Sequence, residues 1–168
     1  MLTFFLSTIL AISFITDIKF RKIYNLVTLP SIIASLLYYF YIFGIDGFFF
    51  SGKGFLVGVG LLIIPYLLGG MGAGDVKLMA AIGALMGASF VFYSFIYTAL
   101  IGGVIALVLI MKSKGVWNTI KSFFFNVVFL RSNLGSMTIS KDKASSISFP
   151  YGVAIVLGTF CTLIWGGF

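Results

Sequence analysis

Six long stretches of this sequence contain almost no charged side chain: roughly residues 2–18, 25–43, 54–70, 76–92, 94–111 and 150–167. Of the 168 residues, 61% are hydrophobic and only 9% are charged, so the chain cannot hide its apolar surface in a soluble core. Each stretch is close to the length that a transmembrane helix needs. The sequence therefore predicts an all-α fold: a polytopic membrane bundle of six transmembrane helices, forming a single domain over residues 1–168.

The segments between these stretches predict how the helices are connected. A single helix over residues 78–111 would be about 50 Å long, far beyond the roughly 30 Å of the hydrocarbon layer. We therefore expect a tight hairpin near Ser89–Ser94. The Gly-rich connection that contains Ser51 and Lys53 is expected to be a flexible outer loop.

A longer connection, about residues 112–149, is polar and basic at its ends and is expected to be a cytoplasmic loop. Within it, apolar side chains recur at helical spacing: Trp117, Ile120, Phe124, Val127 and Val128. Polar residues lie on the opposite face of the same helix, which is typical of an amphipathic helix in the membrane interface. We predict such a helix here, with membrane anchoring as its ordinary role.

Basic residues indicate the orientation of the chain in the membrane. The first apolar stretch is followed by Lys19, Arg21 and Lys22 rather than preceded by basic residues, which predicts a retained span with its end in the cytoplasm. Both termini then face outward. The net charge of +7 is explained by this distribution, so nucleic acid is not an expected partner.

Acidic residues are scarce: the chain has four Asp, no Glu and no His. Asp17 ends the first apolar stretch and Asp75 precedes the fourth, and the predicted topology places both on the cytoplasmic side. A carboxyl group at a membrane boundary is costly unless it has a function. The alternatives are a helix cap for Asp75 and a pair with Arg21 for Asp17. Asp46 and Asp142 lie in predicted loops and are expected to be solvated.

The residue inventory limits the chemistry. Without His, the chain has no Ser–His or Cys–His nucleophile and no His-based zinc motif. Its single cysteine, Cys161, excludes a zinc site built from a Cys cluster. A Ser–Lys pair formed by Ser51 and Lys53 is a weak candidate in a flexible loop. We expect neither a metal ion nor a cofactor.

An aspartyl dyad remains, because two carboxyl groups that share one proton act as general base and general acid without other groups. Asp17 and Asp75 are therefore the candidate catalytic residues. Gly72 and Gly74 are expected to shape the site by allowing close approach of a substrate strand. Lys77 and Asn25 are further candidates for shaping the site or binding substrate.

Three segments resemble a known family. Residues 72–87 read GAGDVKLMAAIGALMG, residues 17–28 read DIKFRKIYNLVT and residues 149–155 read FPYGVAI. They resemble the signature segments of the type IV prepilin peptidases, membrane aspartyl proteases with a GxGD motif. Tyr24 stands where these enzymes usually have Pro.

The resemblance implies a function for the chain. It implies that Asp17 and Asp75 are the catalytic pair, and that the enzyme removes short basic leader peptides from prepilin-like precursors at the cytoplasmic face of the cell membrane. Larger relatives also methylate the new N-terminus with a region that carries Cys-x-x-Cys motifs. This chain lacks such motifs, so we expect a short, peptidase-only enzyme, as in tight-adherence pilus systems or archaea.

Two other functions remain open at the level of sequence. A presenilin-like or signal-peptide-peptidase-like protease would share the GxGD segment but cleave within a helix. A small transporter, channel or assembly scaffold would use membrane aspartates to bind cations, and Gly-rich helices are compatible with that role.

Overall fold

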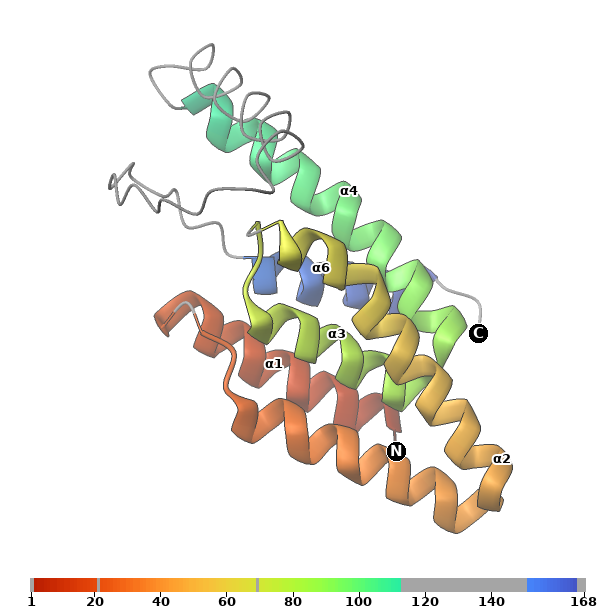
Figure 1. Cartoon of the computed structure of the whole chain (residues 1–168). Coiled ribbons are helices and arrows are strands. Elements are labelled where there is room, and N and C mark those ends of the chain that lie inside the picture. Colours follow the sequence, from red (N-terminus) through yellow and green to blue (C-terminus); the bar gives the residue numbers. More distant parts are fainter. Residues whose placement is uncertain (1, 21, 69, 113–150, 166–168) are drawn as a thin grey trace, which may run out of the picture. The chain divides into compact units, whose positions relative to one another are not determined.

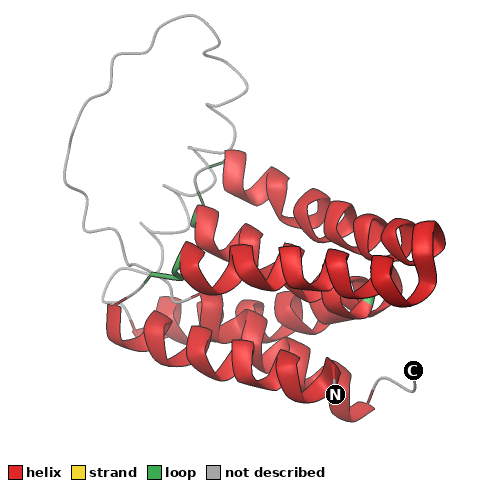
Figure 2. Cartoon of the chain, turned by 90° about the horizontal axis from the view of Figure 1, so that it is seen from below, coloured by secondary structure: helices red, strands yellow, loops and turns green. Residues whose placement is uncertain are grey.

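The computed structural model describes residues 2–20, 22–68, 70–112 and 151–165, which form helices joined by short connections (Figure 1). The helices are α1 (Leu2–Phe20), α2 (Asn25–Leu67), α3 (Ala73–Met86), α4 (Ala88–Lys112) and α6 (Tyr151–Trp165). No strand occurs among these residues (Figure 2). The predicted all-α class is confirmed.

The chain divides into two compact units. The first contains Met1–Gly102 and Pro150–Phe168, and all the packing described below belongs to it. The second, Gly103–Phe149, is described only at the end of α4. The predicted interfacial helix lies in residues 113–149 and is therefore outside the described residues. The assignment of a single domain to residues 1–168 stays a prediction.

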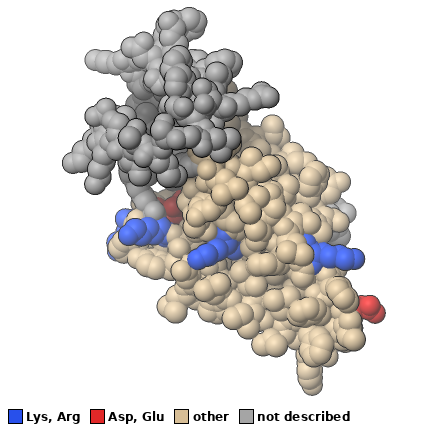
Figure 3. All heavy atoms as spheres, viewed as in Figure 1, with Lys and Arg blue, Asp and Glu red and all other residues tan. Residues whose placement is uncertain are grey.

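Three helices are long and apolar enough to cross a membrane: α1, α2 and the Ala88–Val108 part of α4. Many large apolar side chains on them are exposed, among them Leu26 (85%) and Tyr41 (91%). Figure 3 shows few charged side chains on the described part of one face. Exposed apolar surface of this extent is expected where lipid is the solvent. The chain is therefore a membrane protein.

The predicted number of six spanning helices is not confirmed. α3 and α6 contain 14 and 15 residues. At about 1.5 Å per residue they are roughly 21–23 Å long, which is less than the hydrocarbon thickness of about 30 Å.

α2 contains two of the predicted apolar stretches and changes direction at one residue. Gly44 has φ 63° and ψ −139°, a conformation that glycine adopts readily because it has no Cβ. Figure 1 shows the chain turning back within α2. The predicted loop around Ser51 and Lys53 is therefore wrong, because helix continues from residue 45 onward.

The burial of Ser51 removes the weak alternative of a Ser–Lys catalytic pair. Ser51 is fully buried, and its hydroxyl donates a hydrogen bond to the carbonyl oxygen of Ala84 at 2.8 Å. Lys53, two residues later, is exposed. The Ser51 hydroxyl therefore joins α2 to α3 and does not face a substrate.

The next reversal also lies earlier than predicted. α3 ends at Met86, α4 begins at Ala88, and Gly87 between them has φ 88°. The predicted hairpin at Ser89–Ser94 is wrong because a single glycine in the left-handed region makes the turn. Ser94 is instead a buried residue within α4.

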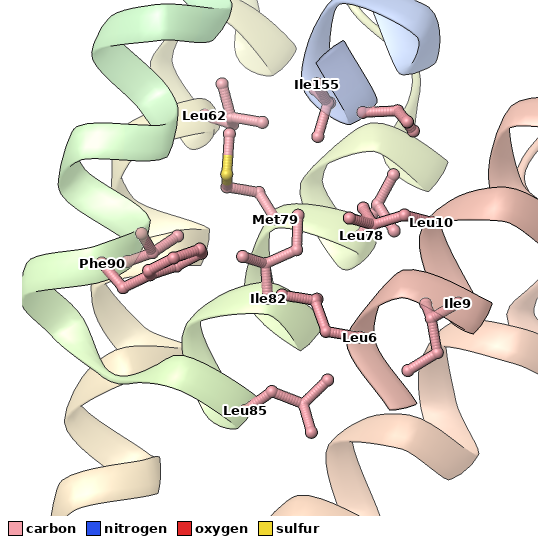
Figure 4. Packing of buried hydrophobic residues seen from close by; sticks show 12 residues of the cluster. Leu6, Ile9, Leu10, Leu62, Leu78, Met79, Ile82, Leu85, Phe90 and Ile155 are labelled. Carbon is pink, nitrogen blue, oxygen red and sulfur yellow. The ribbon is translucent and has the colours of Figure 1, made fainter. Parts of the chain in front are cut away.

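α3 lies at the centre of the first unit. Every residue from Leu78 to Leu85 is buried, and Figure 4 shows its side chains meeting residues from the neighbouring helices. This core includes Leu6, Leu10, Leu62, Leu78, Met79, Ile82, Leu85 and Ile155. Because α3 is covered by protein, the helix that carries Asp75 is shielded from lipid.

Glycines bring α2 and α3 into close contact. A Cβ added at Gly54 would overlap the carbonyl group of Gly83, and one at Gly58 would lie 2.5 Å from the carbonyl oxygen of Met79. Small residues at a contact between membrane helices allow the backbones to approach closely in this way. The contact holds the second half of α2 directly against α3.

Candidate active site

Two aspartates from different helices line one cavity at the end of the bundle where α1 ends and α3 begins. Asp17 lies in the last turn of α1, and Asp75 lies in the first turn of α3. The cavity has a volume of about 360 Å³. Both side chains are buried, with 6% of Asp17 and 8% of Asp75 exposed. The two predicted carboxyl groups therefore lie together.

The short connection before α3 fixes the Asp75 side chain. Gly72 is extended, with φ −80° and ψ 149°, and it precedes the first residue of α3. The Asp75 carboxylate accepts a hydrogen bond from the backbone N–H of Gly72 at 3.1 Å, while the Asp75 N–H donates to the Gly72 carbonyl at 3.1 Å. This is the capping role weighed from the sequence, although the helix begins at Ala73 rather than Val76. Capping holds the carboxylate at the edge of the cavity.

The Asp17 side chain is held by a different helix. Its Oδ2 atom accepts a hydrogen bond from the backbone N–H of Val153, at 3.1 Å, in the first turn of α6. Gly152 lies so close that an added Cβ would be 2.6 Å from the same oxygen. The predicted partner Arg21 lies outside the described residues.

The environment of Asp75 favours its protonated form. Burial raises the pKa of Asp75 to about 6; the hydrogen bond from Gly72 lowers it, and the negative charge of Asp17 raises it. A carboxyl with this pKa gains or loses its proton near neutral pH. Because the charge of Asp17 acts on it, the two groups titrate as a pair.

The family model described as "Type IV leader peptidase family" matches residues 4–107. The chain belongs to the type IV leader peptidase family. The match includes both aspartates and ends within α4, before α6. Membership indicates that the protein is a peptidase. No curated protein and no solved structure shows a significant match to the chain.

In this leader peptidase, the candidate glycines bring parts of its own chain together. Gly72 and Gly74 both line the cavity. A Cβ added at Gly74 would lie 3.0 Å from the Cβ of Ile23, and one at Gly72 would lie 3.3 Å from the Asp75 carboxylate. The predicted approach of a substrate strand to these residues stays a prediction, whereas close packing of the α1–α2 connection against α3 is observed.

The other two candidate residues bond to each other. The Lys77 ammonium group donates a hydrogen bond to the side-chain oxygen of Asn25 at 2.8 Å. Asn25 lines the cavity, whereas Lys77 is not among the lining residues. The pair therefore links the start of α2 to α3.

Sequence reasoning missed Gly152 and Val153 as neighbours of the leader peptidase's Asp17. They are separated from it by more than 130 residues, and Val153 acts through its backbone. The available signal was a glycine at the start of the last apolar stretch, within the FPYG segment. Asp46 is exposed on α2 and does not line this cavity, and Asp142 lies outside the described residues.

Proposed function

We propose that this leader peptidase is an aspartyl endopeptidase in which Asp17 and Asp75 form the catalytic dyad. The observation that carries the proposal is the burial of both carboxyl groups in one cavity. Like charges at short range in a poorly solvated site do not both ionise, so one group keeps a proton and the other does not. The absence of His from the sequence supports a mechanism that needs carboxyl groups alone.

The reaction is a general acid and base hydrolysis. The ionised carboxylate takes a proton from a water molecule as the water oxygen bonds to the scissile carbonyl carbon. The protonated carboxyl gives its proton to the developing oxyanion, which forms a tetrahedral diol. In the second step the carboxyl that took the proton from water gives it to the leaving nitrogen, while the other carboxylate takes a proton back from the diol. The C–N bond breaks, and a carboxylic acid and a free amine are formed.

The substrates we infer are prepilin-like precursors with a short basic leader before an apolar helix. Family membership supports this class. The apolar helix enters the bilayer beside the enzyme, which brings the preceding peptide bonds to the membrane boundary. Lys22 lines the cavity and, being positively charged, does not attract a basic leader. The scissile peptide bond is therefore selected by its depth in the membrane rather than by simple charge attraction.

We further propose that the cavity faces the cytoplasm of a cell membrane and that both termini face outward. Lys19 and Lys22 follow Asp17, and basic residues near the end of a span favour the cytoplasmic side. Methyltransferase activity is not proposed, because the Cys-x-x-Cys motifs linked to it in larger relatives are absent from the sequence.

The test is cleavage by the purified protein in liposomes with a synthetic precursor, and mass spectrometry of the products. We expect one cut between leader and apolar helix, and no product from the double variant Asp17→Asn/Asp75→Asn. A cut inside the apolar helix would favour a presenilin-like enzyme instead. An intact precursor would contradict the proposed function.

A further inference from the structure

The first turn of α6 packs directly against the Asp17 carboxylate. The Val153 N–H donates a hydrogen bond to Oδ2, and a Cβ at Gly152 would lie 2.6 Å from that oxygen and 2.8 Å from Cγ. These distances are well below ordinary van der Waals contact. Only a residue without a side chain fits between this turn of α6 and the carboxylate.

A helix start is suited to holding an anion. The first backbone N–H groups of a helix have no acceptor within the helix and carry a partial positive charge. A hydrogen bond from such a group to a carboxylate is charge-assisted and favours the ionised form. Val153 is the third residue of α6, so its N–H is one of these groups.

We propose that the first turn of α6 is a positioning element for the catalytic dyad: the Val153 N–H orients the Asp17 carboxylate and favours its ionised form, and Gly152 is required for this approach. This inference rests on the proposed function and deepens it. It assigns a role in the reaction to a segment that lies outside the region matched by the family model.

The Gly152 N–H of the same turn acts on Asp17 in the same direction as the Val153 N–H, and both donors belong to the first turn of α6. Asp75 of α3 is a second carboxyl that lies near enough to be affected by the charge of Asp17. Tyr151 of α6 lies near enough to Asp75 to feel its charge. Lys22 and Tyr24, from the connection between α1 and α2, line the same cavity. Among the described groups, the Val153 N–H donates a hydrogen bond of 3.1 Å to Asp17 and thereby fixes the orientation of its carboxylate.

Gly152→Ala isolates this contact. Gly152 does not have a positive φ, in contrast to Gly44 and Gly87, so alanine suits its backbone and only the contact with Asp17 is disturbed. A displacement of about 1 Å in a catalytic group lowers the rate by around 100-fold. We expect kcat to fall about 100-fold with KM changed less than about threefold, because the substrate-binding surface is intact.

The pH–rate profile separates positioning from a merely structural effect. Loss of the N–H bond disfavours the ionised carboxylate, so the acid limb of the kcat profile moves to higher pH. A general loosening of the bundle lowers the amount of active enzyme without moving this limb.

Gly158→Ala is the matched control. Gly158 lies on the same helix, and an added Cβ there would collide with Thr98 of α4 rather than with Asp17. This variant disturbs the packing of α6 to a similar degree. We expect a lower melting temperature, with kcat per folded enzyme and the pH profile unchanged.

Val153→Pro decides the question if Gly152→Ala does not fold. Proline removes the same donor, and the first turn of a helix accommodates it because that N–H has no partner in the helix. We expect kcat to fall at least tenfold and the acid limb to move to higher pH.

The inference is overturned if the wild-type enzyme cleaves while folded Gly152→Ala or Val153→Pro keeps the wild-type kcat and pH profile. It is also overturned if Gly158→Ala lowers kcat as much as Gly152→Ala does. A wild-type enzyme that does not cleave the precursor contradicts the proposed function instead.

Discussion

Both ends of the first compact unit contain aspartate, but the burial and hydrogen bonding of the aspartate side chains differ between them. At one end Asp46 is exposed on α2 beside Phe49, Phe50 and Lys53, which line an open depression with it. At the other end Asp17 and Asp75 are buried and each accepts a backbone N–H. Burial together with a fixed backbone donor, rather than residue type alone, therefore distinguishes the candidate carboxyls from Asp46.

Glycine also has different tasks at the two ends. Near Asp46, Gly44 and Gly87 adopt positive φ and reverse the chain. Near the dyad, Gly74 and Gly152 let backbone and carboxylate approach within distances that a side chain would block. The glycines at one end allow the chain to reverse, and those at the other end allow close contact.

The largest expected effect separates the buried aspartates from the exposed one. Asp17→Asn and Asp75→Asn should each lower kcat by about 10³-fold or more, because each removes a general acid or base. Asp46→Asn, at the opposite end, should change kcat less than about twofold. The measurement is initial cleavage rate with a synthetic precursor. A cleavage-competent Asp17→Asn or Asp75→Asn enzyme would break the comparison.

The second effect is a pH dependence that belongs to the buried end. The free dyad needs one proton: above the pKa of Asp75, about 6, this proton is lost, and at low pH both groups are protonated. We expect kcat/KM to fall on both sides, by about tenfold per pH unit far above the upper limb. Rates measured from pH 4 to 9 test this. Asp46→Asn should leave the profile unchanged, and a flat wild-type profile would contradict a shared proton.

A third, smaller effect concerns the packing between the two ends. Gly54→Ala places a methyl group against the Gly83 carbonyl and should destabilise the fold by about 1–3 kcal/mol. Gly60 is the matched control, because nothing lies within 4 Å of an added Cβ there. Gly60→Ala should be neutral or stabilise the helix by up to about 1 kcal/mol. Chemical unfolding in detergent measures both, and equal stabilities would show that close packing of α2 and α3 is not required.

The smallest effect is expected beside the dyad. Lys77→Met removes the exposed hydrogen bond to Asn25, which is worth about 0.5–1.5 kcal/mol, and leaves both carboxylates in place. We expect a loss of stability in this range and a change in kcat of less than about fivefold. A loss as large as that of Asp75→Asn would show that Lys77 takes part in the chemistry.

The sequence was sufficient to predict the all-α class and to place Asp17 and Asp75 at the same end of the bundle, for physical reasons. Long uncharged stretches favour a lipid environment, and a carboxyl group at a membrane boundary is costly unless it has a partner or a function. The reversals were misplaced because glycine marks both turns and close helix contacts, so Gly44 and Gly87 look like Gly54 and Gly58 in sequence. Ser51 and Lys53 resembled a loop, although the helix passes through them.

The contact with α6 was not predictable by the same reasoning. A backbone N–H leaves no trace in residue type, and the pairing of Asp17 with Val153 is set by tertiary packing. In the sequence, only the glycine at position 152 indicates this contact. The amphipathic helix predicted within residues 113–149 stays a prediction.

The hydrogen bond from Val153 to Asp17 has a consequence for the order of events during biosynthesis. A nascent chain that has delivered α1 to α4 into the membrane already contains both carboxyl groups, but the donor for one of them has not yet been translated. On this account the site is complete only once α6 has been inserted beside α1, so the helices that carry the carboxyl groups do not by themselves form the whole site.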